Sequence, residues 1–166
     1  MRHGLCLRAP ATNLIRSRRV EANQVVEIRI ATEVSDELVA AFELLVPQLS
    51  SSNPPPPRSV LQQIVDCEAS TLFMATDETG ILGTLTLATF RIPTGLRAWI
   101  EDVIVDSEAR GKGVGRLLSV AALDHARSLG AITVELTSRP SREAANRLYQ
   151  RIGFVARDTN VYRFTL

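Results

Sequence analysis

The amino-acid sequence predicts one domain of the α/β (α+β) class, built on a mixed and mostly antiparallel sheet. Its 166 residues are about the length of one domain. Three apolar, β-rich runs at residues 71–75, 81–90 and 98–105 follow one another through short connections, which predicts an antiparallel meander. A helical pattern at 113–129 then leads to another β-rich run at 132–137, so the second half contains a β-α-β crossover.

Residues 1–24 differ from the remainder because they are rich in arginine, hold Glu21 as their only acid, and show no sustained apolar period. We favour a poorly ordered extension as their interpretation. An Arg-rich, acid-poor organelle-targeting peptide is the alternative. We therefore place a single domain over residues 25–166.

The first half of that domain contains a strand and two helices. Apolar and polar residues alternate over 25–30, which predicts a half-buried strand. Ser35 precedes two acids and a helical apolar pattern, so it is the expected N-cap of a first helix. Four prolines at 54–57 predict an extended loop. Ser59 with Gln62 predicts a capping box at the start of a second, short helix.

The second half adds the meander, the crossover and a third group of elements. Gly130 ends the helix that begins near residue 113, and Gly153 ends another helix expected at 141–151. Two short strands are expected at 154–157 and 161–166. The predicted order is β-α-α-β-β-β-α-β-α-β-β, with about seven strands.

The segment from 103 to 116 is the most informative. An apolar strand enters a short polar turn, and a helix follows. Around the helix start lie three alternating glycines and three cations: Arg110, Gly111, Lys112, Gly113, Gly115 and Arg116. Small residues and the free N–H groups of a helix N-terminus suit a diphosphate.

Two other interpretations of this segment are weaker. A tight turn that binds nothing does not explain three glycines together with three cations. A dinucleotide-binding turn requires G-x-G-x-x-G, whereas the spacing from Gly111 through Gly113 to Gly115 is one residue too short, and the preceding strand belongs to a meander.

Two motifs carry a family resemblance over residues 26–166. Arg110-Gly111-Lys112-Gly113-Val114-Gly115 resembles the Q/R-x-x-G-x-G/A motif of the GNAT superfamily of acetyl-coenzyme A-dependent N-acetyltransferases. Leu148-Tyr149-Gln150-Arg151-Ile152-Gly153-Phe154 is similar to that superfamily's L-Y-x-x-x-G-F segment. The resemblance implies a GNAT-like fold, with helices on both faces of the sheet.

The resemblance also implies where acetyl-coenzyme A, the acyl donor, would bind. The backbone amides from Arg110 to Arg116, with Val114 among them, would hold its pyrophosphate. The edge of the strand Val103-Ile104-Val105 would pair with its pantetheine arm, while the strand at 132–137 splays away. Arg142 stands where the family often has an asparagine, and Asn146 lies one turn later, so either residue is a candidate contact.

Attack by an amine requires a base, and departure of the thiolate is helped by an acid. Glu101 and Asp102 are the candidate bases. Strand alternation places Trp99, Glu101 and Val103 on one face and Ile100, Asp102 and Ile104 on the other, so only one carboxylate can face a given cleft. By the resemblance we prefer Glu101 as base and Tyr149 as acid.

The function that follows is acetyl transfer to a primary amine by direct attack in a ternary complex. A coenzyme A-binding sensor or regulatory module without chemistry is the alternative. Acceptors that remain open include an amino-sugar phosphate, suggested by a faint likeness of residues 100–105 to glucosamine-6-phosphate acetyltransferases, and protein or small-molecule amines. Arg91 and Arg97 are candidates to recognise an anionic acceptor.

Composition excludes several partners. The 19 basic and 18 acidic groups give a net charge of +1, which does not favour nucleic acid or a membrane surface. No apolar run is long enough for a spanning helix. His3 and His125 are the only histidines and no Cys/His cluster has zinc spacing, so we expect no metal. We expect a cytoplasmic location, with organelle import left open, and a homodimer is a candidate state because family members often dimerise.

Overall fold

The strand expected at residues 25–30 lies inside the sheet, because another strand forms before it. In this computed structural model, which describes residues 14–20, 24–50 and 52–166, β1 (Leu14–Val20) pairs antiparallel with β2 (Gln24–Ile30). No apolar period in residues 14–20 predicted β1. The rest of the expected extension lies outside the described residues, and the domain boundary at residue 25 stays a prediction.

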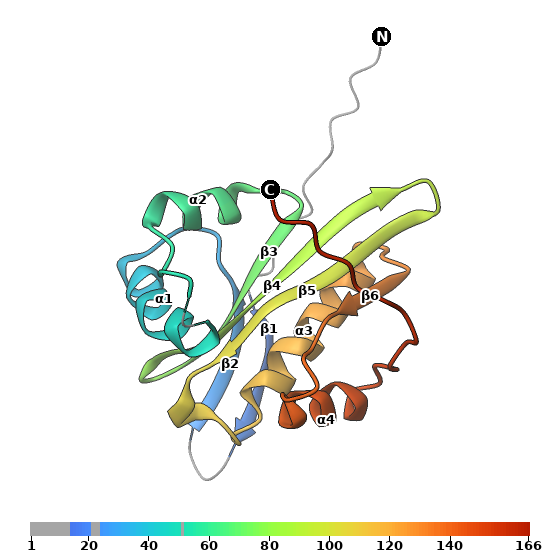
Figure 1. Ribbon diagram of the computed structural model, residues 1–166. Coiled ribbons are helices and arrows are strands. Elements are labelled where there is room, and N and C mark those ends of the chain that lie inside the picture. Colours follow the sequence, from blue (N-terminus) through green and yellow to red (C-terminus); the bar gives the residue numbers. More distant parts are fainter. Residues whose placement is uncertain (1–13, 21–23, 51) are drawn as a thin grey trace. The chain divides into compact units, whose positions relative to one another are not determined.

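The chain divides into two compact units, one ending at Leu136 and the other covering Thr137–Leu166, and each is described by itself. The first unit contains a six-stranded sheet in the order β1-β2-β3-β4-β5-β6 (Figure 1). Its remaining strands are β3 (Ser70–Asp77), β4 (Gly80–Ile92), β5 (Gly95–Val105) and β6 (Thr133–Leu136). Neighbouring strands are antiparallel except β5 and β6, which are parallel. The meander and the crossover are therefore confirmed.

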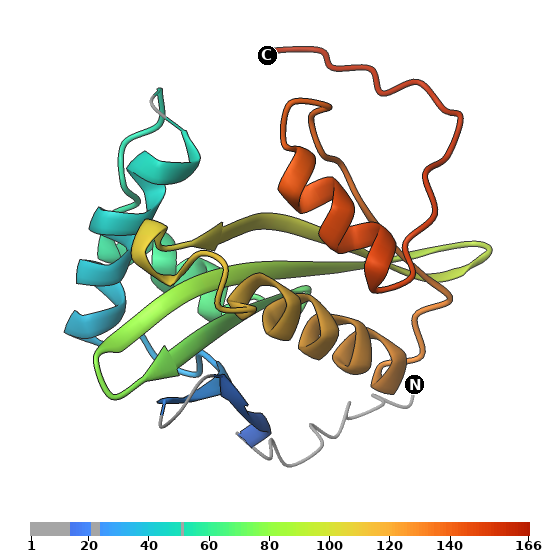
Figure 2. The same cartoon turned by 90° about the horizontal axis from the view of Figure 1, so that it is seen from below.

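Helices cover both faces of this sheet, as the resemblance implied (Figure 2). On one face, α1 (Asp36–Leu49) and α2 (Arg58–Asp66) enclose a core cluster that includes Leu38, Leu61 and Leu72. On the other face lies α3 (Val114–Ser128), where the His125 ring meets the buried Phe73 ring edge to face at 5.7 Å. We call these the α1/α2 face and the α3 face.

A predicted side-chain cap is confirmed at α1 and is wrong at α2. Ser35 caps α1, since its Oγ accepts a hydrogen bond from the Leu38 N–H at 3.1 Å. The predicted capping box at Ser59 is wrong, because α2 begins at Arg58 with Pro57 as its N-cap and no side-chain cap. Gln62 instead donates to Asp66 Oδ1 at 2.9 Å, one turn further along α2. Because proline fixes its own φ, it starts a helix without a side-chain cap.

The second unit contains the helix α4 (Glu143–Arg151), which ends near Gly153 as expected. The two strands expected at 154–157 and 161–166 are wrong, since neither segment forms a strand. The described sheet has six strands instead of about seven. Val155 and Tyr162 are 84% and 88% exposed. The apolar residues of these two segments pack against no neighbouring strand, and a strand is stable only when it pairs with another.

Candidate functional site

The turn after β5 leads into the glycine segment. It contains a short 3-10 helix, η1 (Ser107–Ala109), whose start is capped by Asp106. Asp106 Oδ1 accepts a hydrogen bond from the Glu108 N–H at 2.7 Å, and the Asp106 N–H donates to the Leu82 carbonyl oxygen at 2.9 Å. The turn is therefore anchored both to itself and to β4.

The N-terminus of α3 is open, as a binding site for a diphosphate requires. Gly113 is the N-cap, with φ at +81°, and no side chain of the described chain caps it. The Leu117 N–H makes the first helical bond, to the Gly113 carbonyl at 3.0 Å, so the amides of Val114, Gly115 and Arg116 precede the helical ladder. A Cβ built on Gly111 or Gly113 meets nothing within 4 Å. We call residues 110–116 the cradle.

The three cations of the cradle are exposed, but they are not equivalent. The Arg110 side chain folds back, with Nε donating to the Val105 carbonyl at 3.4 Å and one terminal nitrogen donating to Gln48 Oε1 at 3.5 Å. No such bond is seen for Lys112 or Arg116 within the part of the chain that the structure describes. A diphosphate in the cradle would therefore have those two cations available, together with the helix dipole.

Strand β5 has a free edge next to the cradle. Its parallel pairing with β6 runs from Arg97 opposite Thr133 to Ile100 opposite Leu136 and ends there. From Glu101 to Val105, β5 pairs with β4 on its other side only, among the described residues. This edge fits the place where the resemblance puts a pantetheine arm, although Arg110 already donates to the Val105 carbonyl.

A bulge in β5 changes the side-chain pattern expected from simple alternation. Thr84 of β4 lies opposite Ile104, whereas Thr86 lies opposite Glu101, so β5 has one extra residue between them. Asp102, within the bulge, has φ at +47°. Opposed residues share a face, and Thr84 and Thr86 share one. The expectation that Glu101 and Ile104 lie on opposite faces is therefore wrong.

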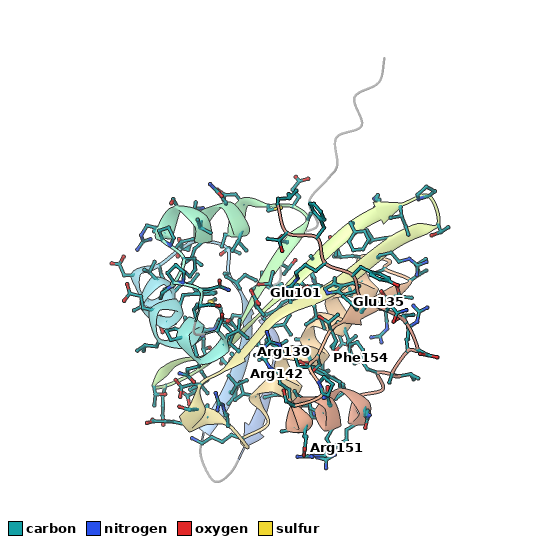
Figure 3. All side chains as sticks on the ribbon, in the orientation of Figure 1. Glu101, Glu135, Arg139, Arg142, Arg151 and Phe154 are labelled. Atoms are coloured by element: carbon teal, nitrogen blue, oxygen red, sulfur yellow. The ribbon has the colours of Figure 1, made fainter. Side chains whose placement is uncertain are left out.

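Glu101 lies on the α1/α2 face and is exposed (Figure 3). Trp99 is on the same face of the strand, opposite Ala88, and its Nε1 atom is buried with no hydrogen-bond partner among the described residues. Phe90, two residues beyond Ala88, is exposed on this face as well. Trp99 is therefore the neighbour of Glu101 on this face of β5, and Phe90 lies further along the same face, opposite Arg97.

The two arginines suggested for an anionic acceptor lie apart. Arg97 is opposite Phe90 on the α1/α2 face, and it donates to Thr133 Oγ1 at 2.9 Å and to Thr94 Oγ1 at 3.5 Å. Arg91 is one residue further along β4 than Phe90, so it lies on the α3 face. The structure therefore does not bring them together on the face that carries Glu101.

The second unit holds the remaining predicted residues. The Tyr149 ring contacts Phe154 edge to face at 5.9 Å, and the Phe154 N–H donates to the Tyr149 carbonyl at 2.9 Å. Burial raises the pKa of Tyr149 above its ordinary value, and the charge of Arg142 opposes that shift. The Asn146 side-chain amide donates to the Arg139 carbonyl at 3.0 Å, which holds the loop before α4.

One residue of the site was missed by sequence reasoning. Gln48 bonds Ser107, Asp106 and Arg110, and the nearest of these is 58 positions away along the chain. No motif or periodicity marks such a contact, because it exists only once α1 packs beside the turn. Among the described residues, no group of three or more His, Cys, Asp or Glu side chains is arranged to hold a metal ion, and no helix has the length and apolar character to cross a membrane.

Sequence relatives share part of their length with this chain. Mycothiol acetyltransferase from Nocardiopsis dassonvillei is 46% identical over 57 residues, which are 34% of this chain and 17% of that protein. N-alpha-acetyltransferase 30 from Schizosaccharomyces pombe is 36% identical over 73 residues, which are 44% of this chain and 48% of that protein. The chain thus matches less than half the length of either relative.

Solved structures share the fold. The crystal structure of glucosamine-6-phosphate N-acetyltransferase from Arabidopsis thaliana is similar with a TM-score of 0.71 and 23% identity, over 84% of this chain and 97% of that one. The sequence profile described as the Acetyltransferase (GNAT) family matches residues 38–154, which contain the cradle, the free edge of β5 and α4. Because this match covers most of the chain, the chain belongs to the GNAT family of acetyltransferases.

Proposed function

We propose that this protein transfers the acetyl group of acetyl-coenzyme A to a primary amine. The observation that carries the proposal is the open N-terminus of α3, where Gly113 caps the helix without a side chain and an added Cβ meets only open space. Free amides of this kind bind phosphate oxygens. The proposed diphosphate site is residues 110–116, and chiefly the amides of Val114, Gly115 and Arg116. The N–H groups of Arg110 and Lys112 already donate to the Ser107 and Ala109 carbonyls at 3.4 Å.

The free edge of β5 is the proposed site for the rest of the donor. Among the described residues, no strand pairs with residues 101–105 on the side that β6 leaves, and an extended arm can add there as a strand would. The thioester, which coenzyme A supplies, would then lie at the level of Glu101. The cradle and this edge belong to the same unit, so their relation is set by the β5–η1–α3 connection.

Glu101 is the proposed base. An amine is nucleophilic only when neutral, and the exposed carboxylate of Glu101 accepts the proton that the ammonium group must lose, directly or through water. Tyr149 is the proposed acid, and it gives its phenolic proton to the departing sulfur. The raised pKa of Tyr149 keeps that proton in place at neutral pH. This role requires the second unit to bring Tyr149 to the thioester.

The acceptor is proposed to bind on the open part of the α1/α2 face, beside Glu101, Trp99 and Phe90. The similar proteins carry different names: mycothiol acetyltransferase, N-alpha-acetyltransferase and glucosamine-6-phosphate N-acetyltransferase. Their names therefore do not agree on one acceptor. Of the two arginines suggested for an anionic acceptor, Arg97 lies on this face, where Thr133 and Thr94 orient it without neutralising its charge, and Arg91 lies on the other face. A homodimer and a cytoplasmic location stay predictions from the sequence.

Two measurements on the purified chain test the proposal. Calorimetry with coenzyme A measures binding, and thiol release from acetyl-coenzyme A measures transfer to a panel of amines: glucosamine 6-phosphate, small-molecule amines and peptides with free N-termini. Binding together with amine-dependent thiol release is the expected result. Binding without release from any amine would support the non-catalytic module, and absence of binding would refute the cradle.

A further inference from the structure

One glutamine joins the end of α1 to the turn that precedes the cradle. Gln48 Oε1 accepts a hydrogen bond from the Ser107 N–H at 2.9 Å and another from Arg110 at 3.5 Å. Gln48 Nε2 donates to Asp106 Oδ2 at 3.3 Å and to the Leu44 carbonyl at 3.2 Å. Both ends of one side-chain amide are therefore used.

A side-chain amide suits these contacts. Glutamine supplies an acceptor for the Ser107 N–H and a donor for the Asp106 carboxylate from one planar group. Asp106 in turn accepts from the Glu108 N–H, so the network runs from α1 through Asp106 into η1. Arg110, the first residue of the cradle, is held at its far end.

We propose that Gln48 is a positioning residue for the cradle. It holds the turn from Asp106 to Arg110 in the conformation that leads the chain into Gly113 with the amides of α3 open. A loop that is ordered before the ligand arrives loses less entropy on binding. The hydrogen bonds of Gln48 to this turn therefore increase the affinity for the diphosphate. The inference rests on the proposed function, because that function places the diphosphate there.

The first experiment compares two glutamine variants of the whole chain. Gln48→Ala removes the tie, while Gln62→Ala removes a similar helix glutamine whose bond goes to Asp66 of α2, away from the cradle. We expect Gln48→Ala to weaken coenzyme A binding about fivefold, the size of one or two lost neutral hydrogen bonds. The KM for acetyl-coenzyme A should rise while kcat at saturation stays, and Gln62→Ala should match the unmodified protein.

A pH series separates positioning from general loss of stability. Gln48→Glu keeps an acceptor for the Ser107 N–H and for the Arg110 guanidinium. It removes the donor to Asp106 and places a second carboxyl there, so the two carboxylates repel each other while Arg110 attracts both. At lower pH one of the two carboxyls takes up a proton, which the pair can share, and the repulsion is removed. The affinity of Gln48→Glu relative to the unmodified protein should therefore recover as the pH falls from 7.5 to 5, whereas that of Gln48→Ala should not.

Amide hydrogen exchange of Ser107 tests the tie without any ligand. Its N–H should exchange faster in Gln48→Ala than in the unmodified protein or in Gln62→Ala. If the unmodified protein binds coenzyme A and Gln48→Ala binds equally well, or if Ser107 exchange is unchanged, the inference is overturned and the proposed function stands. If the unmodified protein does not bind coenzyme A, the proposed function fails and the inference falls with it.

Discussion

Glu101 and Ile104 lie on the same face of the sheet although they are three residues apart in one strand. The register with β4 requires this, since Thr86 and Thr84 are their partners. Ile104 is 4% exposed in the α1/α2 core cluster, so this buried side chain fixes the face to which the exposed carboxylate of Glu101 belongs. Asp102 lies in the bulge that shifts the side-chain alternation of β5 by one residue, and its positive φ is part of that bulge.

This relation supports Glu101 as the proposed base, because it places the carboxylate on the face where we propose that the acceptor binds. Glu101→Gln should lower kcat about a hundredfold, the usual contribution of a general base, without changing coenzyme A affinity. Asp102→Asn should leave turnover unchanged, because asparagine also adopts a left-handed backbone conformation. Steady-state kinetics and calorimetry on both variants measure the two effects. Loss of turnover in Asp102→Asn, with Glu101→Gln still active, would reverse the assignment.

The cradle is tested by two glycines with the same backbone conformation at the two ends of α3. Gly113 has φ at +81° and Gly130 has φ at +82°, and an added Cβ meets open space at both. A valine at either position should cost roughly 1–2 kcal/mol of unfolding free energy through left-handed strain. Only Gly113→Val should also lose coenzyme A binding, because only Gly113 adjoins the open amides. Denaturant melts and calorimetry separate the strain from the binding, and equal affinity of the two variants would argue against the cradle.

Tyr149 is tested by removing its hydroxyl. Tyr149→Phe keeps the ring that meets Phe154, so folding and coenzyme A affinity should be preserved while kcat falls about a hundredfold. Burial raises the pKa of Tyr149, and its ordinary value is 10.0, so the phenol stays protonated from pH 7 to 9. The ratio of unmodified to variant kcat should be constant over that range. A ratio that falls with rising pH would show a lower pKa than the proposed role requires.

The lowered pKa of His125 predicts that the free energy of unfolding decreases at acidic pH. Burial lowers the pKa of His125 below its ordinary 6.5, where its ring contacts Phe73 and Nε2 lies 3.4 Å from Thr71 Oγ1. Below pH 6.5 the unfolded chain binds the proton more readily than the folded chain, so unfolding becomes easier as the pH falls toward the lowered value. Thermal melts from pH 8 to 5 should show this loss, and His125→Gln should reduce it. An equal slope in both proteins would exclude His125 as the cause.

Local patterns were sufficient for much of the fold. Ser35 at the start of α1, the turn between β3 and β4, and the glycines at both ends of α3 are each short-range signals, because caps and turns are decided by backbone groups a few residues away. The cradle was predictable for the same reason. Strand pairing was harder to predict. Residues 154–157 and 161–166 have the composition of strands but pair with no neighbouring strand. Conversely, β1 pairs with β2 although its residues show no periodic pattern.

What the sequence determined by itself is the family, the open helix start and the residue types that suit acetyl transfer. Only the tertiary structure decided that Glu101 shares a face with Ile104, that Arg97 is held by Thr133, and that Gln48 holds Ser107. The physical reason is that these features depend on contacts between residues far apart in the sequence. A bulge depends on register against a neighbouring strand, and a side-chain tie across 59 positions depends on how a helix packs, neither of which leaves a periodic trace in the residues that form it.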